Sequence, residues 1–302
     1  MGKPPGSLTL RPTAMPASLC SVCITKVVDT PNGEIQPGHG TGFFLRDDEE
    51  KCWLVTNWHV LTGRRPDNPG QLLVGYPQSP SKIMFAVPMH VDGDFTKPIE
   101  MDLYDKKGMP KWIELPREAG LDLVALPFAE QSHQNIVTIQ DFCRTDDRAF
   151  EPGTDLVIIG FPFQHDEDTP HPVWKKGMVA SEPKFANFGI PQFLIDSSSK
   201  PGMSGSPIYR VSKGFRATKN VVDIVESYAS GDDSALDKWQ EINLKQMQDD
   251  THVLDFVGIY SGATGDKKLL GLQFGRAMLS SLAHTLLSSK SMGENPFSPD
   301  KF

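Results

Sequence analysis

The residues most able to do chemistry lie between Ser197 and Tyr209, where glycines frame one serine. A serine hydroxyl is a weak nucleophile, so a catalytic serine needs a general base and donors aimed at the developing oxyanion. Ser204 is the candidate nucleophile. Gly202 permits the backbone conformation that turns its own N–H and that of Ser204 toward one point, and Gly205 lets a substrate backbone approach. On this segment alone, a Gly/Ser/Pro surface turn is an equally good interpretation.

His59 is the best candidate for the base that Ser204 would need. It comes soon after the β-like run Leu54–Asn57, so the end of a rigid strand would hold it in place. The chain has eight histidines, and the others have no comparable context.

An imidazole that acts as a base needs a carboxylate to fix its tautomer. Asp122 interrupts the apolar run Gly120–Leu126, and because carboxylates are seldom buried without a partner, it is the candidate for that role.

The elements that must position these residues are predicted to be short strands in two sets. The first set lies at 17–28, 40–45, 52–57, 71–76, 82–89, 111–115 and 121–128, and the second at 154–163, 171–180, 192–196, 206–211, 253–261 and 269–274. Amphipathic helices do not alternate with these strands, which argues against a parallel α/β sheet. We therefore expect an all-β protein built from two antiparallel β-barrels. A helical period is convincing only near the end, over Arg276–Ser288.

The same pattern divides the chain into successive parts. We expect a Pro-rich lead at 1–16, a first barrel at 17–128, a polar connection at 129–152, a second barrel at 153–277, and a C-terminal helix with a loose tail at 278–302. Residues 213–251 form a long, charged and partly helix-like stretch inside the second barrel, which predicts a surface insertion. Its acidic cluster is most simply a solvated face, and the insertion is the candidate binding element for a regulatory protein partner.

Composition excludes several classes of protein. The 302 residues carry a net charge of −8, so no basic face predicts nucleic-acid or anionic-membrane binding. Apolar runs are too short for a membrane span, and the N-terminus lacks a signal-peptide core. Four cysteines suit a reducing compartment, and we expect a cytoplasmic protein. Cys20 and Cys23 form a C-x-x-C pair, but without a second pair at zinc-site spacing their flanks favour strand packing over metal or redox chemistry.

Taken together, the three candidate segments resemble the trypsin-like serine proteases of the chymotrypsin fold. The match consists of Gly-Thr-Gly-Phe before Leu-Val-Thr-Asn-x-His-Val, then Asp-Leu-Val-Ala-Leu, then Pro-Gly-Met-Ser-Gly-Ser-Pro. The order of the histidine, aspartate and serine is the family's order, and the resemblance covers about residues 18–277. The layout, including Ile159–Pro162 and Gly177–Val179, is most similar to that of the bacterial high-temperature-requirement branch, although we expect no room for a PDZ-type domain after Ala277.

This resemblance implies two Greek-key barrels with the site in the cleft between them. It assigns the three candidates the roles of base, orienting acid and nucleophile, and it places the N–H groups of Gly202 and Ser204 in the oxyanion hole. It also implies that Ser261 supports Asp122 and, with Gly262, begins the backbone edge on which an extended substrate adds as a strand. A protein or peptide is the implied substrate. No metal or organic cofactor is required for this chemistry.

Several positions depart from the family pattern. Met203 stands where digestive members carry an aspartate that pairs with a newly cut N-terminus, and no cysteine soon after His59 could pair with Cys52. Both departures favour an intracellular enzyme that is regulated in another way. Ser198 occupies the position that lines the base of the primary pocket, so no acid there demands Lys or Arg. Arg276 follows the strand that should form another pocket wall; it would favour an acidic substrate residue there, or it points to solvent.

Two other functions compete with this interpretation. Gly202–Ser206 nearly fits the nucleophile elbow of α/β-hydrolases, and Asp255 and His284 follow in that family's order. An elbow must open into a helix, however, whereas Pro207–Tyr209 has the pattern of a strand. The second alternative is a protease-shaped module that binds peptides or a partner without cutting, or that stays latent until an effector binds. The sequence leaves this second alternative open.

Overall fold

The computed structural model describes most of the predicted strands. The described residues are 14–88, 95, 97–116, 120–128, 136–143, 150–163, 171–185, 190–197, 200–212, 216–217, 227, 230, 247–248, 253–263, 274–295 and 297–299. Ser198 and most of the predicted insertion at 213–251 lie outside them. Within the insertion, β15 (Arg216–Ala217) pairs with β16 (Met247–Gln248).

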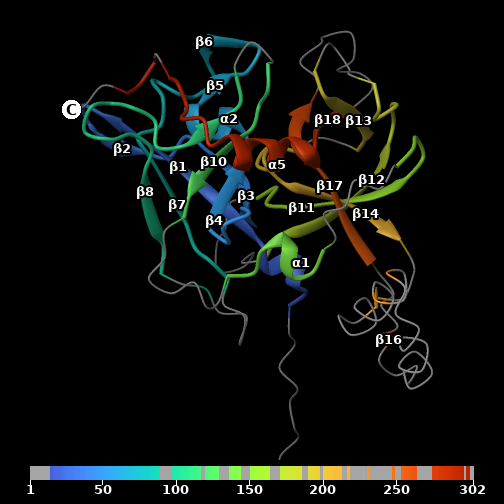
Figure 1. Cartoon of the computed structure of the whole chain (residues 1–302). Helices are drawn as coiled ribbons and strands as arrows, with labels where there is room; N and C mark the ends of the chain where they lie inside the picture. The colour runs from blue at the N-terminus through green and yellow to red at the C-terminus, as the bar shows by residue number, and fades with distance from the viewer. Residues whose placement is uncertain are drawn as a thin grey trace, which may run out of the picture.

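The first half of the chain forms an open antiparallel sheet, seen on the left of Figure 1. Its strands follow the order β8-β7-β1-β3-β4-β10-β9, and β2 pairs with β1. Their bounds are β1 (Ser21–Thr30), β2 (Gly33–Ile35), β3 (His39–Arg46), β4 (Cys52–Thr56), β7 (Lys82–Phe85), β8 (Ile99–Asp102), β9 (Ile113–Glu114) and β10 (Val124–Pro127). A separate hairpin is formed by β5 (Arg64–Arg65) and β6 (Asn68–Leu72). The strand predicted over 71–76 is therefore wrong except at 71–72, where β6 ends.

The second half forms a closed barrel with the strand order β11-β12-β13-β18-β17-β14, seen on the right of Figure 1. The bounds are β11 (Asp155–Gly160), β12 (Val173–Val179), β13 (Gln192–Asp196), β14 (Pro207–Ser212), β17 (Val253–Ala263) and β18 (Phe274–Leu279). The predicted all-β, chymotrypsin-like architecture is confirmed, with the first unit an open half-barrel and the second a closed one. Because a strand, not a helix, follows the Gly202–Ser206 segment, the nucleophile-elbow alternative is wrong.

Two element boundaries differ from prediction. The helix predicted to begin at Arg276 begins at Ser280 as α5 (Ser280–Ser289), because Phe274–Leu279 instead forms β18, which pairs with both β13 and β17 and closes the barrel. Met278 and Leu282 fit a helical period, but the tertiary pairing overrides that local pattern. At the other end, the strand predicted from Ala17 is preceded by α1 (Pro16–Leu19), whose proline occupies a favourable first-turn position.

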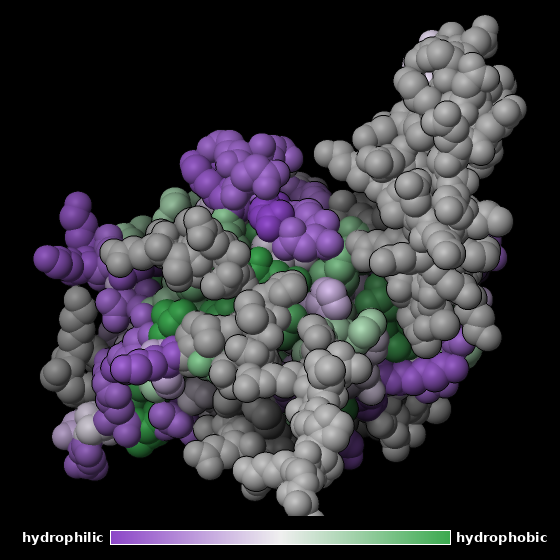
Figure 2. All heavy atoms as spheres, turned by 90° about the horizontal axis from the view of Figure 1, so that it is seen from below, coloured by the Kyte–Doolittle hydropathy of each residue, from purple (hydrophilic) through white to green (hydrophobic). Residues whose placement is uncertain are grey.

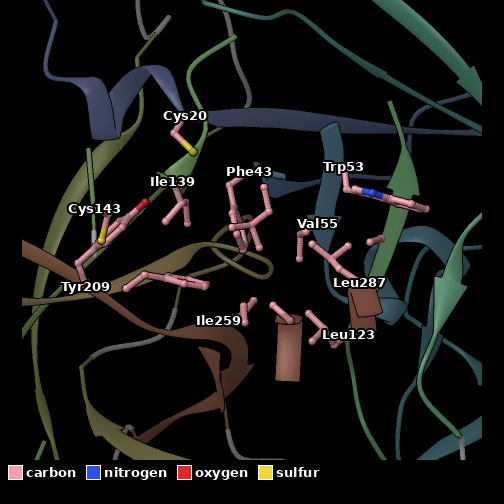
Figure 3. Packing of buried hydrophobic residues seen from close by; sticks show 14 of the residues in the cluster. Cys20, Phe43, Trp53, Val55, Leu123, Ile139, Cys143, Tyr209, Ile259 and Leu287 are labelled. Atoms are coloured by element: carbon pink, nitrogen blue, oxygen red, sulfur yellow. The ribbon is translucent and has the colours of Figure 1, made fainter. Parts of the chain in front are cut away.

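A continuous apolar cluster joins the two sheets. Figure 3 shows Phe43 and Val55 of the first sheet packed near Tyr209 and Ile259 of the barrel. The 3-10 turn η3 (Ile139–Asp141) of the inter-barrel connection adds the buried side chain of Ile139 to the same cluster. Helix α5 contacts β9 and β10 on one side and β17 and β18 on the other, so it covers the junction of the two halves.

The described residues after α5 are packed, although the end of the chain was predicted to be a loose tail. The backbone N–H of Glu294 donates to the Glu114 carboxylate at 2.8 Å, and the ring of Phe297 lies 4.3 Å from the Arg64 guanidinium carbon. The prediction failed because these contacts join residues far apart in sequence, which local composition does not reveal. The described tail therefore braces the first sheet near the β5–β6 hairpin.

The described surface mixes polar and apolar side chains. Figure 2 shows hydrophilic side chains along the rim of the face seen from below and apolar ones visible toward its middle. Large exposed apolar residues on the described surface include Val74, Phe163, Phe185 and Met292. Scattered exposed apolar residues of this kind are normal on proteins. Among the described helices, none is long and apolar enough to cross a membrane.

The ion pair between β14 and β17, whose carboxylate is buried, gives a test of the fold. Arg210 Nε donates to Asp255 Oδ2 at 2.9 Å, and Asp255 is 2% exposed. Replacing Arg210 by methionine removes this cation from a buried carboxylate, so we expect the free energy of unfolding to fall by about 3–5 kcal/mol in urea denaturation. The control is Lys176→Met, which removes the exposed ion pair with Asp155 and should change stability by less than about 1 kcal/mol. Equal effects of the two variants would contradict the structural role of Asp255.

Candidate active site

The segment from Lys200 to Ser206 holds Ser204 in a backbone form that requires glycine on both sides. Gly202 and Gly205 both have φ near +88°. Residues with a Cβ rarely adopt this backbone conformation, whereas glycine adopts it readily. A Cβ at Gly205 would lie 2.0 Å from the Thr41 carbonyl oxygen, so only glycine allows this approach to β3. The bond from the Gly205 N–H to Tyr260 O, 2.8 Å long, fixes the other side of the segment.

Thr41 on β3 joins the two halves of the molecule at this segment. Its backbone N–H donates to Ser204 O at 2.8 Å. Its hydroxyl donates to Gly202 O at 2.8 Å and accepts from the Phe161 N–H at 3.0 Å. Its own carbonyl accepts from the Thr56 hydroxyl at 2.7 Å. Every polar group of this fully buried residue is therefore used, and three of the four bonds reach the second barrel.

Gly40, next to Thr41, allows the histidine helix and the serine segment to converge. A Cβ on Gly40 would lie 2.8 Å from the Val60 side chain and 3.5 Å from Ser204 O. Val60 follows His59 in the short helix α2 (Trp58–Thr62), which begins directly after the buried strand β4 and ends at Gly63 in the left-handed conformation. The predicted strand end thus carries His59, on one turn of helix.

His59 and Asp122 are bonded directly. His59 Nδ1 lies 2.7 Å from Asp122 Oδ2, and the backbone N–H of His59 donates to Asp122 Oδ1 at 3.0 Å. Asn57 donates from Nδ2 to the Asp122 backbone carbonyl at 2.7 Å, which fixes the aspartate from a second direction. Since the carboxylate accepts the Nδ1 proton, the other ring nitrogen, Nε2, is the one that can accept a proton.

The predicted support from Ser261 is present in the structure. Its hydroxyl donates to Asp122 Oδ2 at 2.5 Å. Gly262 has φ near +82°, and a Cβ there would lie 3.5 Å from Ser204 Oγ. The end of β17 therefore contacts the carboxylate through Ser261 and lies against the serine hydroxyl through Gly262.

Asp122 stays ionised although it is 1% exposed. Burial by itself raises the pKa of its carboxyl, but the charge of His59 and the hydrogen bonds from His59 and Ser261 outweigh it and hold the pKa below the ordinary value of 3.8. A depressed carboxylate pKa contributes stability above the unfolded-state pKa, and that contribution is lost as the pH falls through the folded pKa. The network therefore stays intact at neutral pH.

His39 is a site residue that the sequence gave no reason to choose. Its Nε2 lies 3.1 Å from Phe161 O, and a Cβ on Gly202 would lie 2.2 Å from that same nitrogen. The imidazole therefore rests against the glycine predicted to form the oxyanion hole. Partial burial lowers its pKa, and the charge of Lys26 lowers it further, while the bond to Phe161 opposes them. Because a carbonyl oxygen only accepts, Nε2 carries a proton.

The remaining predicted residues take different places. Met203 is 1% exposed and packs in the apolar core of the second barrel. It stands at the position where the resemblance puts an aspartate in digestive members of the family.

Arg276 lies on β18 next to Ala277, which faces that core, so the Arg276 side chain leaves the opposite face of the strand. The charge of Arg276 helps to lower the pKa of the Asp67 carboxyl, although the hydrogen bond and charge of Arg65 lower it more. Its predicted role as a pocket wall stays a prediction.

The comparisons with known proteins come from sequence and from structure. A family model described as "Trypsin-like peptidase domain" matches residues 40–215, while no curated protein matches the sequence. Among solved structures, the active form of the Rv3671c protease from M. tuberculosis is 13% identical with a TM-score of 0.47, and the match covers 99% of this chain and 98% of that one. Deg5 is 13% identical with a TM-score of 0.48, and 91% of each chain is covered. The HtrA-type protease AlgW with a tripeptide is 13% identical with a TM-score of 0.46, covering 90% of this chain and 60% of that one.

The Thr41 hydroxyl gives a test of how the two halves are joined. Thr41→Val keeps the shape but leaves a buried carbonyl and a buried N–H without their bonds, so we expect the free energy of unfolding to fall by about 1–3 kcal/mol. Thr41→Ser retains the hydroxyl and should stay within about 1 kcal/mol of the native protein. Urea denaturation of both variants measures the difference. A valine variant as stable as the serine variant would show that these two bonds contribute nothing.

Proposed function

The chain belongs to the trypsin-like peptidase family and is a serine peptidase; from this premise we propose that it cleaves peptide bonds through an acyl-enzyme formed on Ser204. The single observation that carries the proposal is the bond between His59 Nδ1 and the buried Asp122 carboxylate. It leaves Nε2 as the ring nitrogen that can accept a proton. An orienting acid of this kind is what a serine nucleophile requires of its base.

In the proposed reaction, Ser204 Oγ attacks the carbonyl carbon of the substrate while His59 Nε2 takes the hydroxyl proton. The carbon–nitrogen bond breaks as His59 passes that proton to the leaving amine. A water molecule then attacks the ester, gives a proton to His59, and releases the acid product as the proton returns to Ser204. Asp122 stabilises the imidazolium that forms twice in this cycle and does not itself become protonated.

We propose that the N–H groups of Gly202 and Ser204 hold the oxyanion. The observations that support this are the positive φ of Gly202 and the bond of its carbonyl to Thr41, which together set the orientation of the neighbouring peptide groups. His39 supports the same peptide by resting against it. Donors fixed in advance contribute several kcal/mol to such reactions, because they need no rearrangement when the charge develops.

The substrate edge is proposed at the end of β17, around Ser261 and Gly262. The pairing of β17 with β18 shifts register between Tyr260 and Ala263, so the two residues between them are free of regular pairing with β18. An extended peptide can add to such an edge as a further strand. We further propose a cytoplasmic protein whose insertion at 213–251 binds a regulatory partner.

Covalent labelling tests the proposed nucleophile. A fluorophosphonate probe reacts with serines that have an activated hydroxyl, so we expect labelling of the native protein and none of Ser204→Ala. Ser206→Ala is the matched control, because this second serine of the motif is fully buried two residues away, and it should be labelled like the native protein. Proteolysis of a protein substrate by Ser204→Ala would contradict the assignment.

Asp122→Asn tests the orienting acid. The substitution preserves the shape of the side chain but stabilises the wrong imidazole tautomer, so turnover should fall by about 10⁴-fold while the protein stays folded. Peptidase rates measure the first expectation and circular dichroism the second. A native protein that is folded, fails to label and cleaves nothing would instead support the peptide-binding module; labelling that begins only after a partner is added would support a latent enzyme.

A further inference from the structure

We infer that Arg64 is a positioning residue for His59, and that Phe297 in the segment after α5 holds Arg64 in place. The inference rests on the proposed function, because it concerns the placement of the base which that function needs. It starts from residues 291–295 and 297–299, called the tail segment, which runs in red from α5 across the first half of the molecule in Figure 1.

The tail segment is bonded to residues that flank strands of the first sheet. The Gly293 N–H donates to the carbonyl of Trp112, just before β9, at 2.8 Å. Asn295 Nδ2 donates to the hydroxyl of Tyr104, beyond the end of β8, at 2.7 Å. The Phe297 N–H in turn donates to Asn295 Oδ1 at 2.9 Å. This series of directional bonds determines where Phe297 lies.

Phe297 covers a cation whose described contacts include no carboxylate. Arg64 is 8% exposed, and its guanidinium carbon lies 4.3 Å from the centre of the Phe297 ring. Arg64 Nε donates to Ser79 Oγ at 2.9 Å, and the Ser79 hydroxyl donates to Phe297 O at 3.0 Å. An aromatic face attracts a cation more strongly when the cation is desolvated. Phe297 therefore holds the guanidinium through its ring and, by way of Ser79, through its backbone.

Arg64 joins the tail segment to the hairpin of β5 and β6. Arg64 Nη1 donates to the carbonyls of Pro69 and Gly70, each at 3.2 Å. A Cβ on Gly70 would lie 4.0 Å from the Phe297 ring, so the ring lies near the hairpin as well. A guanidinium presents its donors in a rigid fork, whereas an ammonium is a point charge on a flexible stem. The fork can therefore fix Arg64 relative to several groups at once.

The same arginine follows the helix that carries His59. Helix α2 ends at Thr62, and Gly63 takes the left-handed conformation directly after it. The Gly63 N–H donates to His59 O at 3.0 Å, and the Gly63 carbonyl accepts from the Leu73 N–H at 2.8 Å. The Arg64 N–H donates to Thr62 Oγ1 at 3.3 Å. A helix this short has little stability of its own, so its placement depends on the contacts that fix its end. Arg64 supplies such contacts.

Substitution of Phe297 tests the inference without changing Arg64 or the proposed catalytic residues. Phe297→Leu keeps an apolar side chain but removes the aromatic face, so Arg64 is held less firmly. For a fluorogenic peptide that the native protein cleaves, we expect kcat to fall by about 10-fold while KM changes by less than about twofold, because a displaced base impairs turnover more than binding. Phe297→Tyr keeps the ring and should have native kinetics. Met292→Ala is the matched control, since this side chain of the tail segment is 60% exposed, and it should also behave as native.

Arg64→Lys tests the other partner of the same contact. The substitution keeps the charge but removes the fork that reaches Pro69 and Gly70, so kcat should fall as in Phe297→Leu. Circular dichroism checks that each variant is folded. The rate of fluorophosphonate labelling gives a second measure of the nucleophile that needs no peptide, and it should fall by about the same factor as kcat in both variants.

The outcomes separate the inference from the proposed function. Unchanged kcat and labelling in both folded variants, or a raised KM with unchanged kcat, would overturn the role of Arg64 and leave the peptidase assignment standing. A Phe297→Tyr variant as slow as Phe297→Leu would overturn the role of the aromatic ring. A native protein that neither labels nor cleaves would contradict the proposed function and, with it, this inference.

Discussion

The bonds of Thr41 are the constraint on which the geometry of the site depends. One buried residue of the first sheet holds the carbonyls of both Gly202 and Ser204 and the N–H of Phe161, all of which belong to the second barrel. The apolar cluster between the sheets stabilises the contact between the two halves, but apolar contact is not directional. Hydrogen bonds to particular backbone groups are directional, so they determine where the serine segment lies relative to the histidine helix. The glycines around them allow the backbones to come this close.

A second constraint is the buried charge of Asp122. A carboxylate in the core is costly unless several donors face it, and here the donors are His59, through its ring and its backbone, and Ser261. Since His59 belongs to the first sheet and Ser261 to the barrel, the ionised carboxylate draws the two halves together at the point where the reaction is proposed. The same bonds hold its pKa down and fix the tautomer of the histidine. Stability and chemistry thus depend on one network.

From the sequence alone, a candidate site residue could be chosen only where its type is unusual among its sequence neighbours. Asp122 could be chosen because an acid in an apolar strand is unusual, and Ser204 because glycines frame it. Thr41 could not be chosen in this way, since a threonine in a strand is ordinary and its importance lies in a partner far away in sequence, Gly202. The boundary of β18 was missed for a related reason: its pairing with two distant strands outweighs its local helical pattern. Long-range contacts of these kinds leave little trace in composition.

Met203 shows how the serine segment is fixed without the aspartate of the digestive enzymes. An aspartate at this position would need a cation inside the barrel, whereas the methionine is buried among apolar side chains and needs none. Full burial of such a side chain contributes about 1.5–3 kcal/mol. Apolar packing does not orient a backbone, however, and the bonds from Thr41 to Gly202 and Ser204 supply that orientation. The order of the described site therefore follows from packing within the barrel combined with hydrogen bonds from the first sheet.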